Sequence, residues 1–217
     1  MRIWFGVLAA ACATAGLLFL IFKDTRPEGV RIVEAAHDAL LARDAAGLLS
    51  LASEQEVRAL GLTEKKLQRF IDEYVLVDYG GMKVAQADVV EDRPDAEGVH
   101  TLVRTYTTPD GRVARFAFFS RERDEGPYLD NMVWSLFFGR MLEGMGRESM
   151  TGEQVVLLWA ETMERDGDRL TEMGIPGVYM TNTDGDQFLT WKEFAKTRRD
   201  ALAKVEAAEK AATASKK

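Results

Sequence analysis

The C-terminal region contains the stretch Asn182-Thr183-Asp184-Gly185-Asp186-Gln187-Phe188-Leu189-Thr190-Trp191-Lys192-Glu193. Oxygen-bearing side chains stand at its first, third, fifth and ninth positions, and a glutamate closes it at the twelfth. Calcium takes about six to eight oxygen ligands, and alternating acidic side chains in a tight loop bring several oxygens to one point. The stretch therefore predicts a calcium-binding loop. Its expected ligands are Asn182, Asp184, Asp186, the Phe188 carbonyl, Thr190 and Glu193.

This spacing resembles the calcium loop of the EF-hand family, with two departures. Asn182 stands where the family has an aspartate, which removes one negative charge from the ligand set. Gln187 stands where the family has a glycine at a sharp turn. It must adopt a left-handed conformation, at a cost of about 1 kcal/mol, or distort the loop. We therefore expect a single weak Ca²⁺ site, with a dissociation constant of roughly 10⁻⁴–10⁻³ M.

A related segment precedes this loop. Glu164–Glu172 shares Asp-Gly-Asp and a following Leu-Thr with the loop, but it is one residue shorter. Together with the linker Gly174–Gly177, the repeat resembles the compact bacterial EF-hand pairs. That resemblance implies a helix over Glu153–Glu164, then a degenerate first loop that acts as a structural partner. It also implies a short β-bridge between Leu170 and Leu189. A long exit helix is expected from Thr190 onward.

The first part of the middle region has helical patterns. Apolar residues at positions 33, 36, 40 and 41 predict a helix over residues 30–41. Ser53 predicts the N-cap of a short helix that Gly61 ends, and Thr63 predicts the N-cap of the next helix.

Strand patterns follow. Alternation and β-branched content predict strands over residues 82–90, 99–107 and 113–119. Beyond them, residues 132–141 have helical spacing with Asp130 as a possible N-cap, and a strand over residues 132–138 is the alternative.

Helices followed by an antiparallel meander predict an α+β domain with helices packed on one face of a curved sheet. This order of elements is similar to that of NTF2-like or cystatin-like domains. The expected organisation has three parts. Residues 1–29 form a transmembrane anchor and linker, residues 30–147 the α+β domain, and residues 148–217 an EF-hand-like domain with a long C-terminal helix.

The N-terminus predicts a membrane anchor. Ile3–Phe22 is a run of twenty residues without a charge, and a helix of this length spans roughly the 30 Å of a bilayer core. A cleaved signal peptide and a lipoprotein signal using Cys12 are the alternatives, but either leaves Leu17–Phe22 exposed. The two-residue tail favours an uncleaved signal anchor that exports the body. The positive charges of Lys23 and Arg26 favour the opposite orientation.

Motifs of catalysis are absent from the sequence, which has no Gly-rich phosphate loop, nucleophile elbow or HExxH. The two histidines, His37 and His100, are far apart in the chain, so two ordinary, partly buried histidines are preferred over a metal or acid–base pair. The acidic run 88–97 predicts a solvated loop. Several aromatic residues could line an apolar pocket, although plain core is the commoner role: Tyr106, Phe116, Phe118, Phe119 and Trp134.

These expectations combine into two hypotheses. The first is a membrane-anchored calcium-binding protein whose non-catalytic α+β domain recognises a protein partner or a small apolar ligand. The alternative is a ligand-binding or assembly scaffold with a vestigial, metal-free EF-hand pair. A net charge of −7 without a basic, aromatic-interleaved run argues against nucleic acid as a partner. The single cysteine excludes a disulfide framework.

Overall fold

The computed structural model describes residues 26–87, 98–123, 126–145, 152–181 and 185–214. The expected anchor lies outside these residues, and within them no helix has the length and apolar character needed to cross a membrane. The elements are α2 (Glu28–Ala42), α3 (Ala45–Leu51), α4 (Glu54–Leu60), α5 (Glu64–Phe70), the π-helix η1 (Ile71–Val75), β1 (Lys83–Ala87), β2 (Val99–Thr107), β3 (Val113–Arg123), β4 (Gly126–Asp130), α6 (Met132–Met145), α7 (Gly152–Glu172), β5 (Gly177–Met180), β6 (Gln187–Thr190) and α8 (Trp191–Ala214).

The expected α+β class is confirmed. Four antiparallel strands form a sheet in the order β1-β2-β3-β4. The expected strand over residues 99–107 coincides with β2, and the next expected strand is the first part of a longer β3. Strand β4 was not predicted, because Gly126 and Pro127 indicate a turn in isolation. The chain accommodates them in a short strand at the edge of the sheet, where a proline is tolerated.

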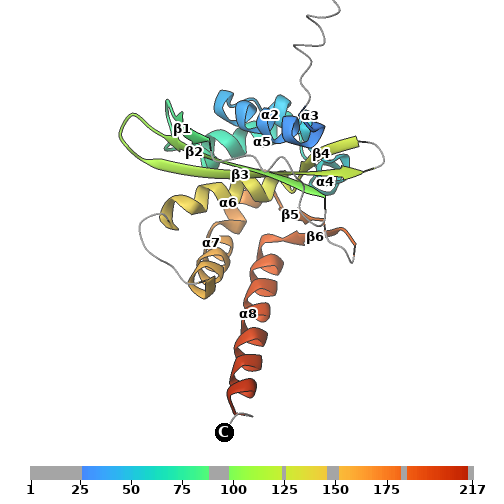
Figure 1. Ribbon diagram of the computed structural model, residues 1–217, viewed down its shortest axis with the longest axis vertical. Coiled ribbons are helices and arrows are strands. Elements are labelled where there is room, and N and C mark those ends of the chain that lie inside the picture. The colour runs from blue at the N-terminus through green and yellow to red at the C-terminus, as the bar shows by residue number, and fades with distance from the viewer. Residues whose placement is uncertain (1–25, 88–97, 124–125, 146–151, 182–184, 215–217) are drawn as a thin grey trace, which may run out of the picture.

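Side chains on one face of the sheet form the core of the domain. Leu102 and Tyr106 of β2 and Phe116 and Phe118 of β3 are all buried, as the two-residue period of a strand predicts for one covered face. Helix α2 lies across this face, with its residue His37 edge-on to Phe118. In Figure 1, α2, α3 and α5 gather on one side of β2 and β3.

Helix α6 lies beside the first part of β3 (Figure 1). Strand β4 pairs with Phe119–Arg123 of β3, its Leu129 also forms a parallel bridge with Ala52, and α6 continues the chain along the remainder of β3. The close approach requires Gly139, because a Cβ there would overlap the Phe116 ring. The helical interpretation of residues 132–141 is therefore confirmed. The proposed N-cap is corrected, since Asp130 ends β4 and Asn131, with φ of 50°, precedes the helix.

The C-terminal region differs from the prediction in two respects. Helix α7 runs without a break through Glu164–Glu172, so the expected degenerate loop is helical. Leu189 pairs with Val178 of β5 and not with Leu170. The physical reason is packing: Leu170 is buried in the core on the inner face of α7. Gly167 fits within the helix because its missing side chain leaves room for Trp191.

One hydrophobic core includes side chains from both sides of the expected boundary near residue 148. The rings of Phe137 and Trp191 lie 4.7 Å apart between centroids. The Tyr74 hydroxyl donates a hydrogen bond to Asp166 at 2.9 Å. The division of the chain into domains stays a prediction, and the described parts of the two regions are packed together.

Candidate functional site

Strand β6 contains the middle of the expected calcium loop. Gln187 lies opposite Met180 in the antiparallel β5–β6 pair, so its backbone is extended rather than left-handed. The sharp turn falls two residues earlier, at Gly185, whose φ is 118°. Gln187 at position six therefore does not adopt the turn conformation. The chain turns at Gly185 and is extended from Gln187 onward.

The end of the loop caps α8. The Thr190 hydroxyl lies 3.3 Å from the Glu193 backbone nitrogen and accepts its hydrogen bond. In return the Glu193 carboxylate accepts bonds from the Thr190 backbone N–H at 2.9 Å and from its hydroxyl at 2.7 Å. This reciprocal arrangement is a capping box. These hydrogen bonds from Thr190 hold the pKa of Glu193 below its usual value.

Asp186, the expected fifth-position ligand, is bonded to the neighbouring strand. Its Oδ2 accepts a hydrogen bond from the Tyr179 hydroxyl at 2.7 Å. That hydroxyl also lies 3.2 Å from Gln55 Oε1 on α4. Phe188, whose carbonyl is the expected seventh-position ligand, has a side chain that is 40% exposed.

The described residues include only part of the expected ligand set. In these residues Gln187–Thr190 form a strand, and the Asp186 and Glu193 carboxylates accept hydrogen bonds from Tyr179 and Thr190. Among the described residues, no group of three or more His, Cys, Asp or Glu could hold a metal ion. Asn182 and Asp184 lie outside those residues, so calcium binding stays a prediction.

His37 is buried in the core, and both of its ring nitrogens form hydrogen bonds. Its Nε2 lies 3.0 Å from the Leu102 carbonyl oxygen, which can only accept, so Nε2 carries the proton. Its Nδ1 therefore accepts from the Tyr106 hydroxyl at 2.7 Å. Burial lowers the pKa of His37 to about 4, because the charged ring would lose its hydration. Both ring nitrogens are thus used within the fold.

Glu56 is a buried carboxylate that the sequence did not single out. Its Oε2 accepts a hydrogen bond from the Met132 backbone N–H at 3.0 Å, and its Oε1 accepts one from Val133 at 2.9 Å. It therefore satisfies two of the free N–H groups at the start of α6. Burial raises its pKa to about 7, although the two N–H bonds act in the opposite direction. The pattern Ser53-x-x-Glu56 suggests a local capping box, but Glu56 accepts its hydrogen bonds from backbone N–H groups of a distant helix.

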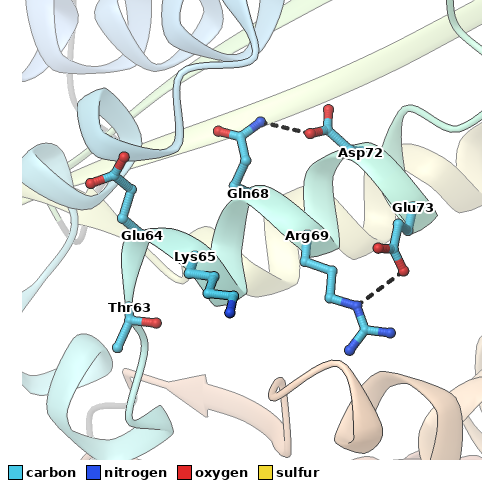
Figure 2. A pocket seen from close by; sticks show the side chains of 7 residues that line it. All are labelled: Thr63, Glu64, Lys65, Gln68, Arg69, Asp72 and Glu73. Atoms are coloured by element: carbon cyan, nitrogen blue, oxygen red, sulfur yellow. Dashed lines mark hydrogen bonds and ion pairs between the residues drawn. The ribbon is translucent and has the colours of Figure 1, made fainter.

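A surface hollow of about 710 Å³ lies along α5 (Figure 2). Gln68 donates to Asp72 at 2.9 Å, and Arg69 donates to Glu73 at 3.0 Å. Charged groups that pair along one exposed helix are typical of a solvated surface, and we assign no chemistry to the hollow. The residues that line it are Thr63, Glu64, Lys65, Gln68, Arg69, Asp72 and Glu73.

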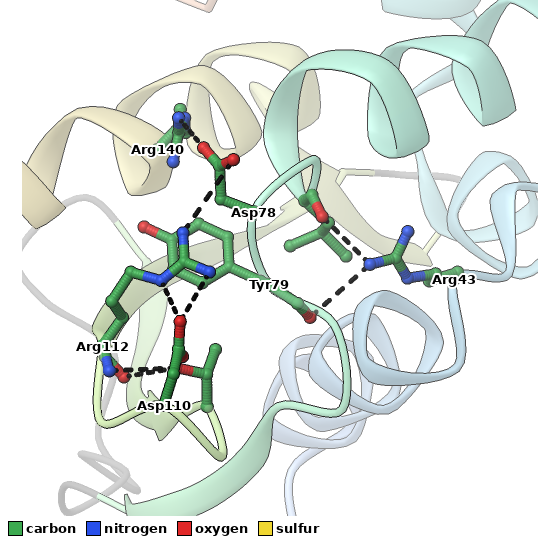
Figure 3. Close-up of polar contacts among 8 residues, drawn as sticks. Arg43, Asp78, Tyr79, Asp110, Arg112 and Arg140 are labelled. Carbon is green, nitrogen blue, oxygen red and sulfur yellow. Dashed lines mark hydrogen bonds and ion pairs between the residues drawn. The ribbon is translucent and has the colours of Figure 1, made fainter.

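A network of arginines and acids joins the loop after η1 to the β2–β3 turn and to α6 (Figure 3). Asp78 accepts a hydrogen bond from Arg140 at 2.6 Å and lies 3.9 Å from Arg112. Both guanidinium groups also face the Tyr79 ring, at 5.4 Å for Arg140 and 5.9 Å for Arg112. These contacts connect three distant segments, and we interpret the network as structural.

The aromatic residues for which a pocket was the alternative to plain core are mainly core. Tyr106, Phe116 and Phe118 are completely buried, whereas Phe119 and Trp134 are half-buried. Tyr106 packs edge-on against Phe116, with ring centroids 6.0 Å apart. The space behind these strands is occupied by the protein's own side chains.

Comparisons with known proteins found no family model, no curated protein and no solved structure that matches the chain. The EF-hand and NTF2-like resemblances therefore stay predictions from the sequence.

Proposed function

We propose that this chain is a non-catalytic binding or assembly protein, held at a membrane by the apolar run Ile3–Phe22. The observation that carries the proposal is the course of α8. Its first turn packs into the core through Trp191, Phe194 and Ala195, and the helix then leads away from the sheet (Figure 1). A helix of 24 residues is about 36 Å long. Helix α8 also packs along α7, to which the Arg199–Glu164 pair joins it. Its later, mainly polar turns gain little stability as an isolated helix, and contact with a partner would stabilise them.

In this proposal the β5–β6 hairpin directs α8. The Trp191 indole N–H donates to the Ile175 carbonyl at 2.7 Å, which fixes the start of the helix against the segment before β5. The carboxylates of Asp186 and Glu193 are engaged by Tyr179 and Thr190. The hairpin thus has a structural role that requires no metal.

Site-specific photo-crosslinking tests the proposal. A photoreactive residue would replace Val205 on α8 in the full-length chain, in membranes of the cells that produce it. Val77, on the loop after η1, is the matched control, because the two side chains are 54% and 53% exposed. We expect a discrete crosslinked product at position 205 and none at position 77. Equal labelling, or none at position 205, contradicts the proposal.

Calcium binding is the second candidate function, with residues 30–147 as the recognition domain. It is favoured by the spacing of oxygen-bearing side chains in residues 182–193 and by the turn at Gly185. A ligand that binds only the folded state raises its thermal stability. If the loop binds calcium, Tm rises with about 1–10 mM Ca²⁺, does not rise with Mg²⁺, and no longer responds to Ca²⁺ in Asp184→Asn. The scaffold proposal expects no calcium response in either protein.

A further inference from the structure

Arg198 on α8 is a half-buried cation with an incomplete set of contacts. Its guanidinium carbon lies 4.7 Å from the centre of the Phe194 ring. Its Nε is buried and has no hydrogen-bond partner, and no described carboxylate pairs with it. Burial lowers its pKa, as expected when a charge loses hydration without gaining a counter-ion.

The other half-buried arginines in the described part of the chain are paired. Each has a carboxylate oxygen within 3.3 Å. They are Arg43, Arg104, Arg112, Arg121, Arg140 and Arg199. Partial burial of a charge without a partner is unfavourable, so Arg198 is the exception that calls for a further contact.

The side chains around Arg198 indicate what kind of group would complete its contacts. Phe194 packs edge-on against Trp134, and Trp134 packs edge-on against Trp159, with centroid distances of 5.1 and 5.6 Å. The Trp159 indole N–H is also buried and has no acceptor. Both groups are donors without an acceptor among the described residues. The half-buried rings of Trp134 and Trp159 supply apolar surface beside these groups.

The charge of α8 selects the sign of the partner. The chain as a whole is acidic, with a net charge of −7, yet residues 191–205 contain five basic and two acidic residues. Lys192 and Arg199 are paired with acids of α7, whereas Lys196 and Lys204 are exposed. Without the two paired residues, three basic and two acidic residues remain, so this part of α8 keeps a small positive excess that favours a negatively charged partner.

We propose that Arg198, together with Trp134 and Trp159, forms a docking site for an acidic segment of a partner protein, in which a carboxylate stands next to an apolar side chain. The guanidinium binds the carboxylate, and the aromatic rings cover the apolar neighbour. The site rests on the proposed assembly function and specifies the chemistry of its partner.

The test uses the full-length chain in detergent and the probe 3-phenylpropionate, a carboxylate with an apolar tail. Its neutral amide, 3-phenylpropanamide, is the control ligand, and tryptophan fluorescence reports binding. We expect the acid to bind at least about tenfold more tightly than the amide. This preference is lost in Arg198→Met. It is kept in the matched control Arg199→Met, because Arg199 already pairs with Glu164.

Thermal unfolding separates a binding role from a structural one. Replacing an unpaired, half-buried cation by an apolar residue of similar length is expected to keep Tm or raise it. Arg199→Met removes a bidentate ion pair and is expected to keep Tm or lower it. The proposal is overturned if Arg198→Met lowers Tm more than Arg199→Met does. Equal binding of acid and amide overturns it too, as does Arg198-dependent binding to vesicles of anionic lipid.

Crosslinking at Val205 distinguishes this site from the assembly function. If Arg198→Met abolishes the crosslinked product and Arg199→Met does not, the docking site is supported. A product that survives Arg198→Met overturns the docking site and leaves the assembly function standing. The absence of any product in the unmodified protein overturns the assembly function itself, whatever the probe binds.

Discussion

Helices α6 and α8 start in similar ways but are stabilised by different kinds of interaction. Each follows an antiparallel strand pair, and each begins beside a glutamate that accepts hydrogen bonds from backbone N–H groups. At α8 the glutamate is Glu193, three residues beyond the cap Thr190 and exposed. At α6 it is Glu56, which belongs to α4, lies 76 residues before Met132 and is completely buried.

The difference shows how burial decides the effect of one chemical group. Hydrogen bonds from Thr190 lower the pKa of Glu193, because water still solvates its charge. Burial raises the pKa of Glu56 even though it accepts two hydrogen bonds. The exposed cap Glu193 therefore favours its ionised form. The buried cap Glu56 joins α4 to α6, and its burial disfavours the ionised form.

The largest effect is expected for Glu56→Ala. It leaves the N–H groups of Met132 and Val133 buried without an acceptor and opens a cavity. The free energy of unfolding should fall by about 3 kcal/mol or more, measured by denaturant unfolding. Glu54→Ala on the same helix is the control, since Glu54 is 74% exposed and should change stability by less than about 0.5 kcal/mol. Equal effects would show that the bonds to α6 contribute little.

The pH dependence of stability should reflect Glu56. Its pKa is about 7 in the folded protein and 4.5 when the side chain is free in water. Its contribution is therefore present below pH 4.5 and is lost as the pH rises through about 7, by roughly 3 kcal/mol in all. Unfolding titrations from pH 4 to 8 should show this fall in the unmodified protein relative to Glu56→Gln. Parallel profiles for the two proteins would refute it.

The contribution of His37 to the free energy of unfolding should change with pH in the opposite direction to that of Glu56. Its pKa is about 4 when folded and 6.5 when free, so its contribution is present above pH 6.5 and is lost as the pH falls toward 4. The size is again roughly 3 kcal/mol. The two contributions oppose each other between pH 4.5 and 6.5. Glu56→Gln should thus unmask a rise of stability with pH in this range, and a second change, His37→Gln, should remove that rise. A rise that persists in the double variant would exclude His37 as its source.

The smallest effect is expected at α8. Thr190→Ala removes a local, half-buried N-cap and should lower the free energy of unfolding by about 1 kcal/mol. Thr190→Ser keeps the hydroxyl and should change it less. Circular dichroism during thermal unfolding measures both. If Thr190→Ala costs as much as Glu56→Ala, the contrast between the local and the buried cap is wrong.

Much of the fold could be predicted because the signals are local. The N-caps Ser53 and Thr63 and the left-handed Gly61 are found where the sequence places them, since each acts within a few residues of its own position. Strand β2 was predicted to the residue because β-branched and aromatic residues favour a strand over Val99–Thr107. Helix α8 starts at Trp191, one residue after the expected start at Thr190.

The candidate sites were less predictable because they depend on distant partners. The Asp-Gly-Asp segment 166–168 suggests a loop, yet it is helical, since Leu170 must reach the core and Trp191 packs against Gly167. Gln187 is extended because β6 pairs with β5. Nothing near Arg198 in the sequence indicates that its guanidinium is half-buried without an acid.

The amino-acid sequence was sufficient to predict the α+β class, strand β2, the first part of β3, the N-caps Ser53 and Thr63 and the position of the exit helix. Each of these rests on side chains and backbone groups within about one helical turn or one strand. Tertiary packing was needed to show that Glu56 caps α6, that α7 is continuous and that Arg198 has no counter-ion among the described residues. The physical reason is that burial sets the energy of a charge or a hydrogen bond, and burial depends on segments far apart in the chain.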